Sequence, residues 1–311
     1  MSPSSQKRRP HKTKAAAPVR PPGMSDIPVF LKKTGLRPRK SLGQHFLVDE
    51  LLLSDIAGAA VLDRTVPVLE IGAGPGVLTQ ELLARADTVV AVEIDEDFAA
   101  LTRERLSPEY PGLTVIAADI LEFEPVELLA EAGVTPPYVA VGNLPYYITQ
   151  PIVRKLLECD PAPDRIVVLV QREVAQRMAG GPGRESLLSI SIKLYGEPKL
   201  LFDVPSTAFW PPPKVQSAVV AIDRFEAPAL GLSAEQIEQF FHLVRAGFAQ
   251  PRKQLHNILV DESGYPRDEI LAVLEAAGID PVLRPQHLTL EDWGRLFDAF
   301  VAAFPEALDV R

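Results

Sequence analysis

Four short apolar segments, each closely followed by a glycine turn or a polar side chain, constrain the fold of this chain more than any other feature. They cover residues 66–71, 88–92, 113–117 and 138–142, and the residues after or at their carboxyl ends are Gly72, Glu93, Asp119 and Asn143. Buried strands that alternate with helical patterns predict an α/β fold with a largely parallel sheet and helices on both faces. The carboxyl ends of such strands are where open α/β sheets bind ligands, so we expect these four residues to line one site. A lone carboxylate at a strand end is more often solvated or a helix cap, and the prediction therefore depends on the shared placement.

The first apolar segment runs into the glycine turn of residues 72–76 and then into a helical pattern over residues 77–83. Such a turn at a helix N-terminus lets a ligand approach the backbone closely. Its spacing departs from the GxGxxG pattern of dinucleotide sites, which favours a nucleoside-type cofactor. Glu93 follows about 20 residues later, where a ribose-binding acid belongs. Together with Asp119, which could accept from an adenine amino group, these residues favour a nucleoside-type cofactor such as S-adenosylmethionine over a dinucleotide.

The tetrapeptide formed by Asn143, Leu144, Pro145 and Tyr146 follows the fourth segment and brings together an amide, a carbonyl and an aromatic ring. The N6 nitrogen of adenine is a poor nucleophile because its lone pair is delocalised into the ring. An asparagine oxygen and a backbone carbonyl can hold both N–H bonds and turn that lone pair outward. Pro145 restricts the residue before it to extended backbone, and Tyr146 offers a ring on which an extruded base can stack. The alternative is a strand that ends in an ordinary turn, with Tyr146 in the core.

Six motifs together make the chain resemble the ribosomal-RNA small-subunit adenine N6,N6-dimethyltransferase family. They lie at residues 41–47, 69–79, 142–149, 171–177, 208–217 and 252–259. The resemblance implies a Rossmann-like S-adenosylmethionine methyltransferase sheet and a smaller C-terminal helical domain. It departs from the family pattern at His45 and Tyr147, where asparagine is common, and in the loop 182–189, which lacks a Tyr-Gly pair.

The resemblance also implies roles for single residues. The implied cofactor contacts are His45, Leu47, Gly72, Glu93, Asp119 and Asn143. The implied catalytic and target-base residues are Asn143, Leu144, Pro145, Tyr146 and Phe209. Two alternatives stay open: His45 as a helix cap, and Phe209 buried in the core beneath a rigid proline-rich connector.

Charge is distributed unevenly along the chain, whose net charge is −9. The first 40 residues carry 11 Lys or Arg and one acid, which leaves 21 basic and 40 acidic residues in the remainder. We interpret the start as an arm for nucleic acid on an acidic body, although a merely solubilising extension would have the same composition. The candidate RNA contacts within the body are Arg172, Arg177, Arg184, Lys214, Arg252 and Lys253.

The predicted organisation is a disordered basic tail over residues 1–23, a Rossmann-like methyltransferase domain over 24–226 and a small α-helical RNA-binding domain over 233–311. Residues 166–170 are the expected fifth strand, and 199–204 with 217–222 close the sheet with an antiparallel member. The single Cys159 excludes an intrachain disulfide, and the scattered histidines predict no metal site. No apolar run reaches the roughly 18 residues of a membrane span. We expect a cytoplasmic monomer.

The implied substrate is a pair of adjacent adenines in a hairpin near the 3′ end of small-subunit (16S) rRNA, within an immature ribosomal subunit. The predicted chemistry is direct transfer of the sulfonium methyl group to N6, repeated to give dimethyladenine. Three alternatives remain: a large-subunit (23S) rRNA dimethyltransferase that confers antibiotic resistance, a DNA amino-methyltransferase, and a non-catalytic rRNA-binding assembly factor. A DNA enzyme is disfavoured because the chain has no obvious DNA-recognition domain, and a pure scaffold would not need Glu93, Asp119 or the Asn143 motif.

Overall fold

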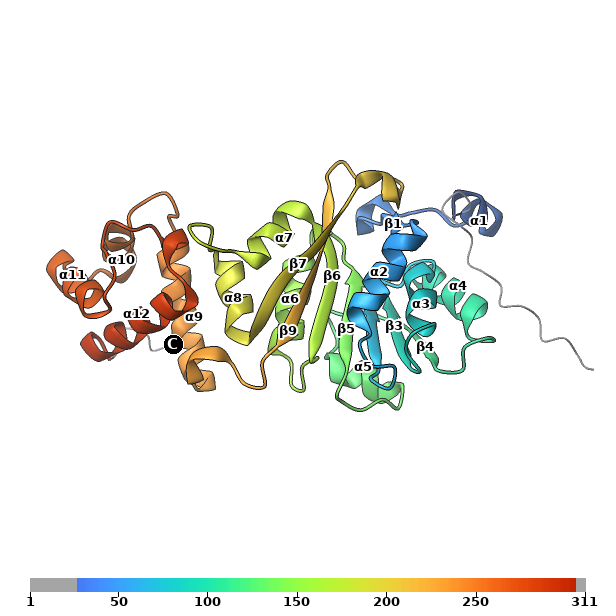
Figure 1. Cartoon of the computed structure of the whole chain (residues 1–311), viewed down its shortest axis with the longest axis horizontal. Helices are drawn as coiled ribbons and strands as arrows, with labels where there is room; N and C mark the ends of the chain where they lie inside the picture. The colour runs from blue at the N-terminus through green and yellow to red at the C-terminus, as the bar shows by residue number, and fades with distance from the viewer. Residues whose placement is uncertain (1–26, 306–311) are drawn as a thin grey trace, which may run out of the picture.

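A computed structural model describes residues 27–305, which form a central sheet with helices on both faces and a helical unit at one end (Figure 1). The strand order is β4-β3-β2-β5-β6-β9-β7. The strands span Val68–Ile71 (β2), Val89–Glu93 (β3), Leu113–Ala117 (β4), Val139–Asn143 (β5), Arg165–Gln171 (β6), Gly196–Val204 (β7) and Ser217–Arg224 (β9). The strands β2 to β6 pair in parallel, and β9 pairs antiparallel with both β6 and β7. The predicted α/β class, the fifth strand and the antiparallel closing member are confirmed.

Two apolar cores lie on opposite faces of this sheet because successive side chains of a strand point to opposite sides. On β2, for example, Val68 packs into one core and Leu69 into the other. The first core is covered by Glu50–Ala60 (α2), Val77–Leu83 (α3) and Glu96–Leu106 (α4). The second is covered by Pro125–Glu131 (α5), Thr149–Glu158 (α6), Arg172–Ala179 (α7) and part of Leu187–Tyr195 (α8). Both faces of the parallel strands are therefore buried, which explains their continuous apolar runs.

A second, two-stranded sheet joins segments that lie far apart in the sequence. Phe46–Leu47 (β1) pairs antiparallel with Phe209–Trp210 (β8), with Phe46 opposite Trp210 and Leu47 opposite Phe209. The backbone of Val48 continues this contact by donating to the Ala208 carbonyl at 2.9 Å. The pairing places the segment that follows Ile27–Thr34 (α1) beside the proline-rich segment near the sheet edge.

The C-terminal helices form a core of their own. They span Ala234–Phe248 (α9), Leu255–Ser263 (α10), Arg267–Ala276 (α11) and Leu290–Ala303 (α12). Trp293 is completely buried at the centre and packs so closely on Gly247 that a Cβ atom there would lie 2.2 Å from the indole. Ile190 and Leu194 of α8 also belong to this core. The predicted boundary at residue 226 therefore does not separate the two cores completely, since α8 packs into both.

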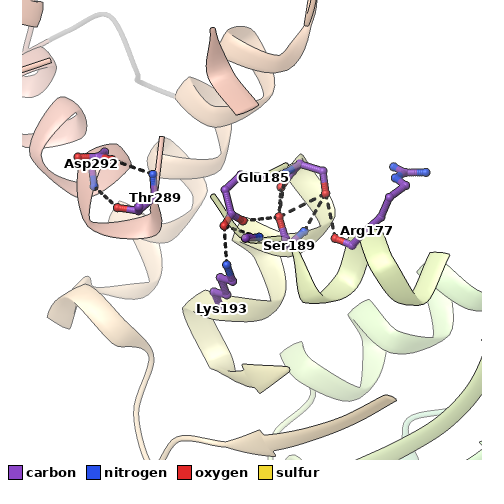
Figure 2. A network of polar contacts seen from close by, with 8 residues as sticks. Arg177, Glu185, Ser189, Lys193, Thr289 and Asp292 are labelled. Atoms are coloured by element: carbon purple, nitrogen blue, oxygen red, sulfur yellow. Dashed lines mark hydrogen bonds and ion pairs between the residues drawn. The ribbon is translucent and has the colours of Figure 1, made fainter. Parts of the chain in front are cut away.

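A polar network at α8 strengthens this junction (Figure 2). The buried carboxylate of Glu185 accepts from the Ser189 hydroxyl at 2.7 Å and pairs with Lys193 at 2.6 Å. The Glu185 backbone N–H donates to the carbonyl of Gln286, which lies in the 3-10 helix before α12. At the start of α12, Thr289 and Asp292 form a reciprocal capping box. The bond between Glu185 and Gln286 ties the loop before α8 to the C-terminal unit.

The predicted disordered tail over residues 1–23 lies outside the described residues. Within residues 27–305, no helix is long and apolar enough to cross a membrane.

Candidate functional site

The structure brings the four strand-end residues into one cavity of about 180 Å³ at the carboxyl edge of the sheet. Gly72, Glu93 and Asn143 come from the ends of β2, β3 and β5, and Asp119 follows β4 by two residues. Parallel pairing explains this, because the four strands point the same way and end at the same edge. None of the described residues that line the cavity is a lysine or an arginine.

Glu93 is buried and held by backbone donors. One carboxylate oxygen accepts from the Gly74 N–H at 2.7 Å, and the other accepts from the Asp95 N–H at 3.0 Å. Burial raises the pKa of Glu93, although these two hydrogen bonds favour the charged form and oppose the shift. Each oxygen keeps a second lone pair, so the group can still accept from the two hydroxyls of a ribose.

The glycine turn lies against β1. Gly74 has a φ of +53°, and a Cβ atom there would lie 2.9 Å from the ring of Phe46. A side chain at this position would therefore have to displace the ring of Phe46. The bare turn, the two carboxylates and the absence of lining cations fit S-adenosylmethionine, whose sulfonium and ammonium groups are positive and whose ribose carries a diol. Asp119 accepts from the Leu121 N–H through one oxygen at 2.9 Å.

Asn143 links the cavity to the segment before β1. Its side-chain amide nitrogen donates to the His45 carbonyl at 2.9 Å, an assignment that leaves the side-chain oxygen as an acceptor for a ligand. The next carbonyl along the chain, that of Leu144, accepts no hydrogen bond from any residue in 27–305, while the Leu144 side chain is buried in the core. The two acceptors that an exocyclic amino group requires are therefore present side by side in the sequence.

Tyr146 is half-buried at the mouth of the same cavity. Its hydroxyl lies 2.7 Å from the Ser217 hydroxyl, and its ring stacks on His45 with ring centres 6.1 Å apart. The His45 ring donates through Nδ1 to the Pro211 carbonyl at 2.7 Å. His45 is therefore not a helix cap, because Asp49 caps the nearest helix, α2. Burial raises the pKa of Tyr146, so its hydroxyl stays protonated and acts as a positioning group.

Two implied site residues lie elsewhere. Phe209 is only 3% exposed and packs in the core against β1, so its ring does not line the cofactor cavity in this structure, and its contact with the target base stays a prediction. Leu47, its partner across the two strands, is buried in the same core and does not line the cofactor cavity. The alternative interpretation, in which Phe209 is core beneath a proline-rich connector, is the one that the structure shows. The hydrogen-bonding register of β1 and β8 turns both side chains inward.

The six candidate RNA contacts are scattered, and two of them have ionic partners. Arg172 pairs with Asp203 at 3.2 Å, and Lys253 pairs with Asp261 at 3.1 Å. The other four are exposed: Arg177, Arg184, Lys214 and Arg252. Only Lys214 lies in a hollow that also contains Tyr146.

Sequence reasoning missed the residues that surround Lys214 in that hollow. Lys32 and Arg37 come from α1 and the segment after it, and Trp210 comes from β8. The sequence signal that could have indicated this hollow was the occurrence of Trp210 and Lys214 within one proline-rich segment. No group of three or more potential metal ligands occurs among the described residues.

The chain matches the family described as ribosomal RNA adenine dimethylase over residues 35–301. A protein named ribosomal RNA small subunit methyltransferase A from Dehalococcoides mccartyi is 41% identical over 281 residues, which cover 90% of this chain and 94% of that protein. One of the same name from Listeria monocytogenes is 38% identical over 276 residues, which cover 86% of this chain and 92% of that protein.

Two solved structures share the fold over nearly their whole length. The 23S rRNA methyltransferase ErmE is 33% identical with a TM-score of 0.66, and the match covers 82% of this chain and 98% of ErmE. A dimethyladenosine transferase from Plasmodium falciparum is 28% identical with a TM-score of 0.70, and the match covers 83% of this chain and 98% of that protein.

Proposed function

Because this chain belongs to the ribosomal RNA adenine dimethylase family, we propose that it dimethylates N6 of two adjacent adenines in a hairpin near the 3′ end of small-subunit (16S) rRNA. The observation that carries the proposal is the placement of the Asn143 oxygen and the unbonded Leu144 carbonyl beside an acid-lined cavity. The choice of the small subunit is supported by relatives with that name that match over nearly their whole length.

The residues of the site act by positioning the adenine and the cofactor. When bound, S-adenosylmethionine supplies an electrophilic methyl group. Glu93 and Asp119 would hold its ribose and adenine, and Gly74 leaves room for them. The Asn143 oxygen and the Leu144 carbonyl accept the two N6 hydrogens and turn the nitrogen lone pair toward the cofactor. A proton then leaves to water, because the methylated amine is acidic, and most of the acceleration comes from orientation.

The ring of Tyr146 is the surface on which the target base would stack. Its hydrogen bond to Ser217 and its contact with His45 hold that ring at the mouth of the cavity. The rigid ring lowers the entropy cost of holding an extruded base in line. We further propose that the enzyme acts as a cytoplasmic monomer on an immature small subunit and needs no metal ion.

A large-subunit substrate is the second candidate, because ErmE, whose name refers to 23S rRNA, has the same fold at 33% identity. The test is methyl transfer from labelled S-adenosylmethionine to undermethylated small subunits, large subunits and naked DNA in parallel. We expect dimethyladenine only in the small-subunit RNA. Label in large-subunit RNA or DNA would keep the chemistry and change the substrate, and absence of label despite cofactor binding would favour a non-catalytic assembly factor.

A further inference from the structure

A second hollow, of about 930 Å³, opens next to the cofactor cavity. The two hollows share Gly43, Gln44, His45 and Tyr146, so the ring of Tyr146 lies at the point where they meet. One wall of this hollow, which we call the entrance groove, is formed by residues 32–38. The opposite wall is formed by residues 210–215, which the β1–β8 pairing holds in place.

The entrance groove is positively charged in a chain whose net charge is −9. Lys32, Arg37 and Lys214 line it, and no Asp or Glu among the described residues does so. All three cations are exposed, and none of their side chains forms a salt bridge or hydrogen bond within residues 27–305. Charges that have no protein partner and surround an aromatic side chain are suited to a phosphate backbone with a base.

We propose that the entrance groove holds the nucleotide next to the target adenine, with its base stacked on Trp210 and its phosphate near Lys32, Arg37 and Lys214. The proposal rests on the proposed function, in which two adjacent adenines are methylated in turn. While one adenine occupies the site beside Tyr146, its covalent neighbour must lie within one nucleotide of that ring. The entrance groove is the hollow that continues from Tyr146 away from the cofactor cavity.

A rival occupant would be the chain's own N-terminal segment, which precedes α1 in the sequence. Residues 1–26 carry six Lys or Arg and one acid, so this segment and the groove have the same sign of charge. Like charges repel, and an anionic ligand is therefore favoured over the segment. The same segment would add to the positive field that attracts RNA.

The stacking part is tested with Trp210→Ala and Trp210→Phe on small subunits that carry either the natural RNA or RNA with an abasic site next to the target adenine. Removing the stack should raise KM on natural RNA about five- to a hundredfold with kcat nearly unchanged. The phenylalanine variant should recover most of the loss. On abasic RNA the KM of the wild type should rise to that of Trp210→Ala, because neither protein can form the stack.

If Trp210→Ala raises KM on abasic RNA as much as it does on natural RNA, the role of Trp210 is structural and the proposal is overturned. The proposal is also overturned if the variant and the wild type have equal KM on natural RNA. Unchanged cofactor affinity of the variant, measured by calorimetry, checks that the β1–β8 pairing is intact. If the wild type fails to label natural small subunits, the proposed function fails. If the wild type is active and the variant matches it, only the entrance groove fails.

The charge part has a matched control within one helix. Lys32 lines the groove, whereas its neighbour Lys33 is exposed and does not. Lys32→Ala should reduce the steepness with which log RNA affinity falls against log salt concentration by about one, the amount expected for one lost phosphate contact. Lys33→Ala should leave this steepness unchanged. Equal slopes for both variants would exclude a phosphate contact at Lys32.

Discussion

The two hollows that meet at Tyr146 have opposite charge. Among residues 27–305, the cofactor cavity is lined by Glu93 and Asp119 and by no Lys or Arg, whereas the entrance groove is lined by three cations and by no acid. Each sign complements the proposed ligand, a sulfonium nucleoside on one side and a polyanion on the other. The contrast teaches that negative and positive side chains are separated within a short distance on the two sides of Tyr146. The net charge of the chain therefore says little about the charge of its site.

The two hollows are also built differently. The acids of the cofactor cavity follow parallel strands, and Glu93 is held by backbone N–H groups. The cations of the entrance groove lie on α1, on the loop after it and on the proline-rich segment, and their side chains have no ionic or hydrogen-bond partner in the described part of the chain. A preformed cavity suits a small rigid ligand, whereas long exposed side chains can adjust to an RNA backbone.

The largest expected effect concerns a third acid, Glu70, which lies on β2 but outside the cofactor cavity. It is completely buried, and burial raises its pKa to about 8 against the smaller, opposing effect of the nearby Thr79 hydroxyl. The folded protein therefore keeps a proton at neutral pH that the unfolded chain has lost. Stability should fall as pH rises from about 4.5 to about 8.

Glu70→Gln should remove this loss of stability at high pH. The variant should be more stable than the wild type above pH 8 by at most about 5 kcal/mol, the free energy that corresponds to the full pKa shift, and the gain should shrink toward pH 5. Denaturant unfolding of both proteins across this range checks it. A stability gain that does not vary with pH would mean that Glu70 is charged at neutral pH. The acidic side of the comparison would then include a third negative charge, on β2.

The next effect concerns Asn143, at the meeting point of the two hollows. Asn143→Ala removes the side-chain acceptor for the N6 hydrogen, and kcat should fall about a hundred- to a thousandfold, as for other positioned groups that act in the transition state. Because Asn143 also lines the cofactor cavity, kcat is measured at saturating S-adenosylmethionine, and the same substitution at Asn257 in α10 is the control. Turnover near the wild-type value would remove Asn143 from the mechanism.

Glu93→Gln tests the cofactor cavity without changing the entrance groove. The carboxylate accepts from two backbone N–H groups and, by our proposal, from the ribose hydroxyls, so the amide should weaken cofactor binding about ten- to a hundredfold. Because the pKa of Glu93 is raised, wild-type cofactor affinity should decrease as pH falls through that pKa, and the variant should lose this dependence. Calorimetric titration with S-adenosylhomocysteine measures both. RNA affinity should stay constant, and a comparable loss there would show that the two hollows are not independent.

The cofactor cavity could be predicted from the sequence because parallel strands make it. Apolar runs identify β2 to β5, and their common direction brings Gly72, Glu93, Asp119 and Asn143 to one edge. The entrance groove could not be predicted, since it depends on the pairing of β1 with β8, two strands of two residues each. Such short strands have no periodicity, and their partners lie far apart in the chain.

The smallest expected effect concerns Phe209, where the resemblance and the structure disagree. Its ring is buried opposite Leu47, and Trp210 faces the entrance groove instead. Phe209→Leu keeps an apolar side chain of similar volume, so activity should stay within about threefold of the wild type, with a loss of stability of about 1 kcal/mol. Single-turnover methylation and thermal unfolding check the two parts. If kcat falls a hundredfold while stability is unchanged, the ring turns outward to meet the base, and the aromatic surfaces of the site move during the reaction.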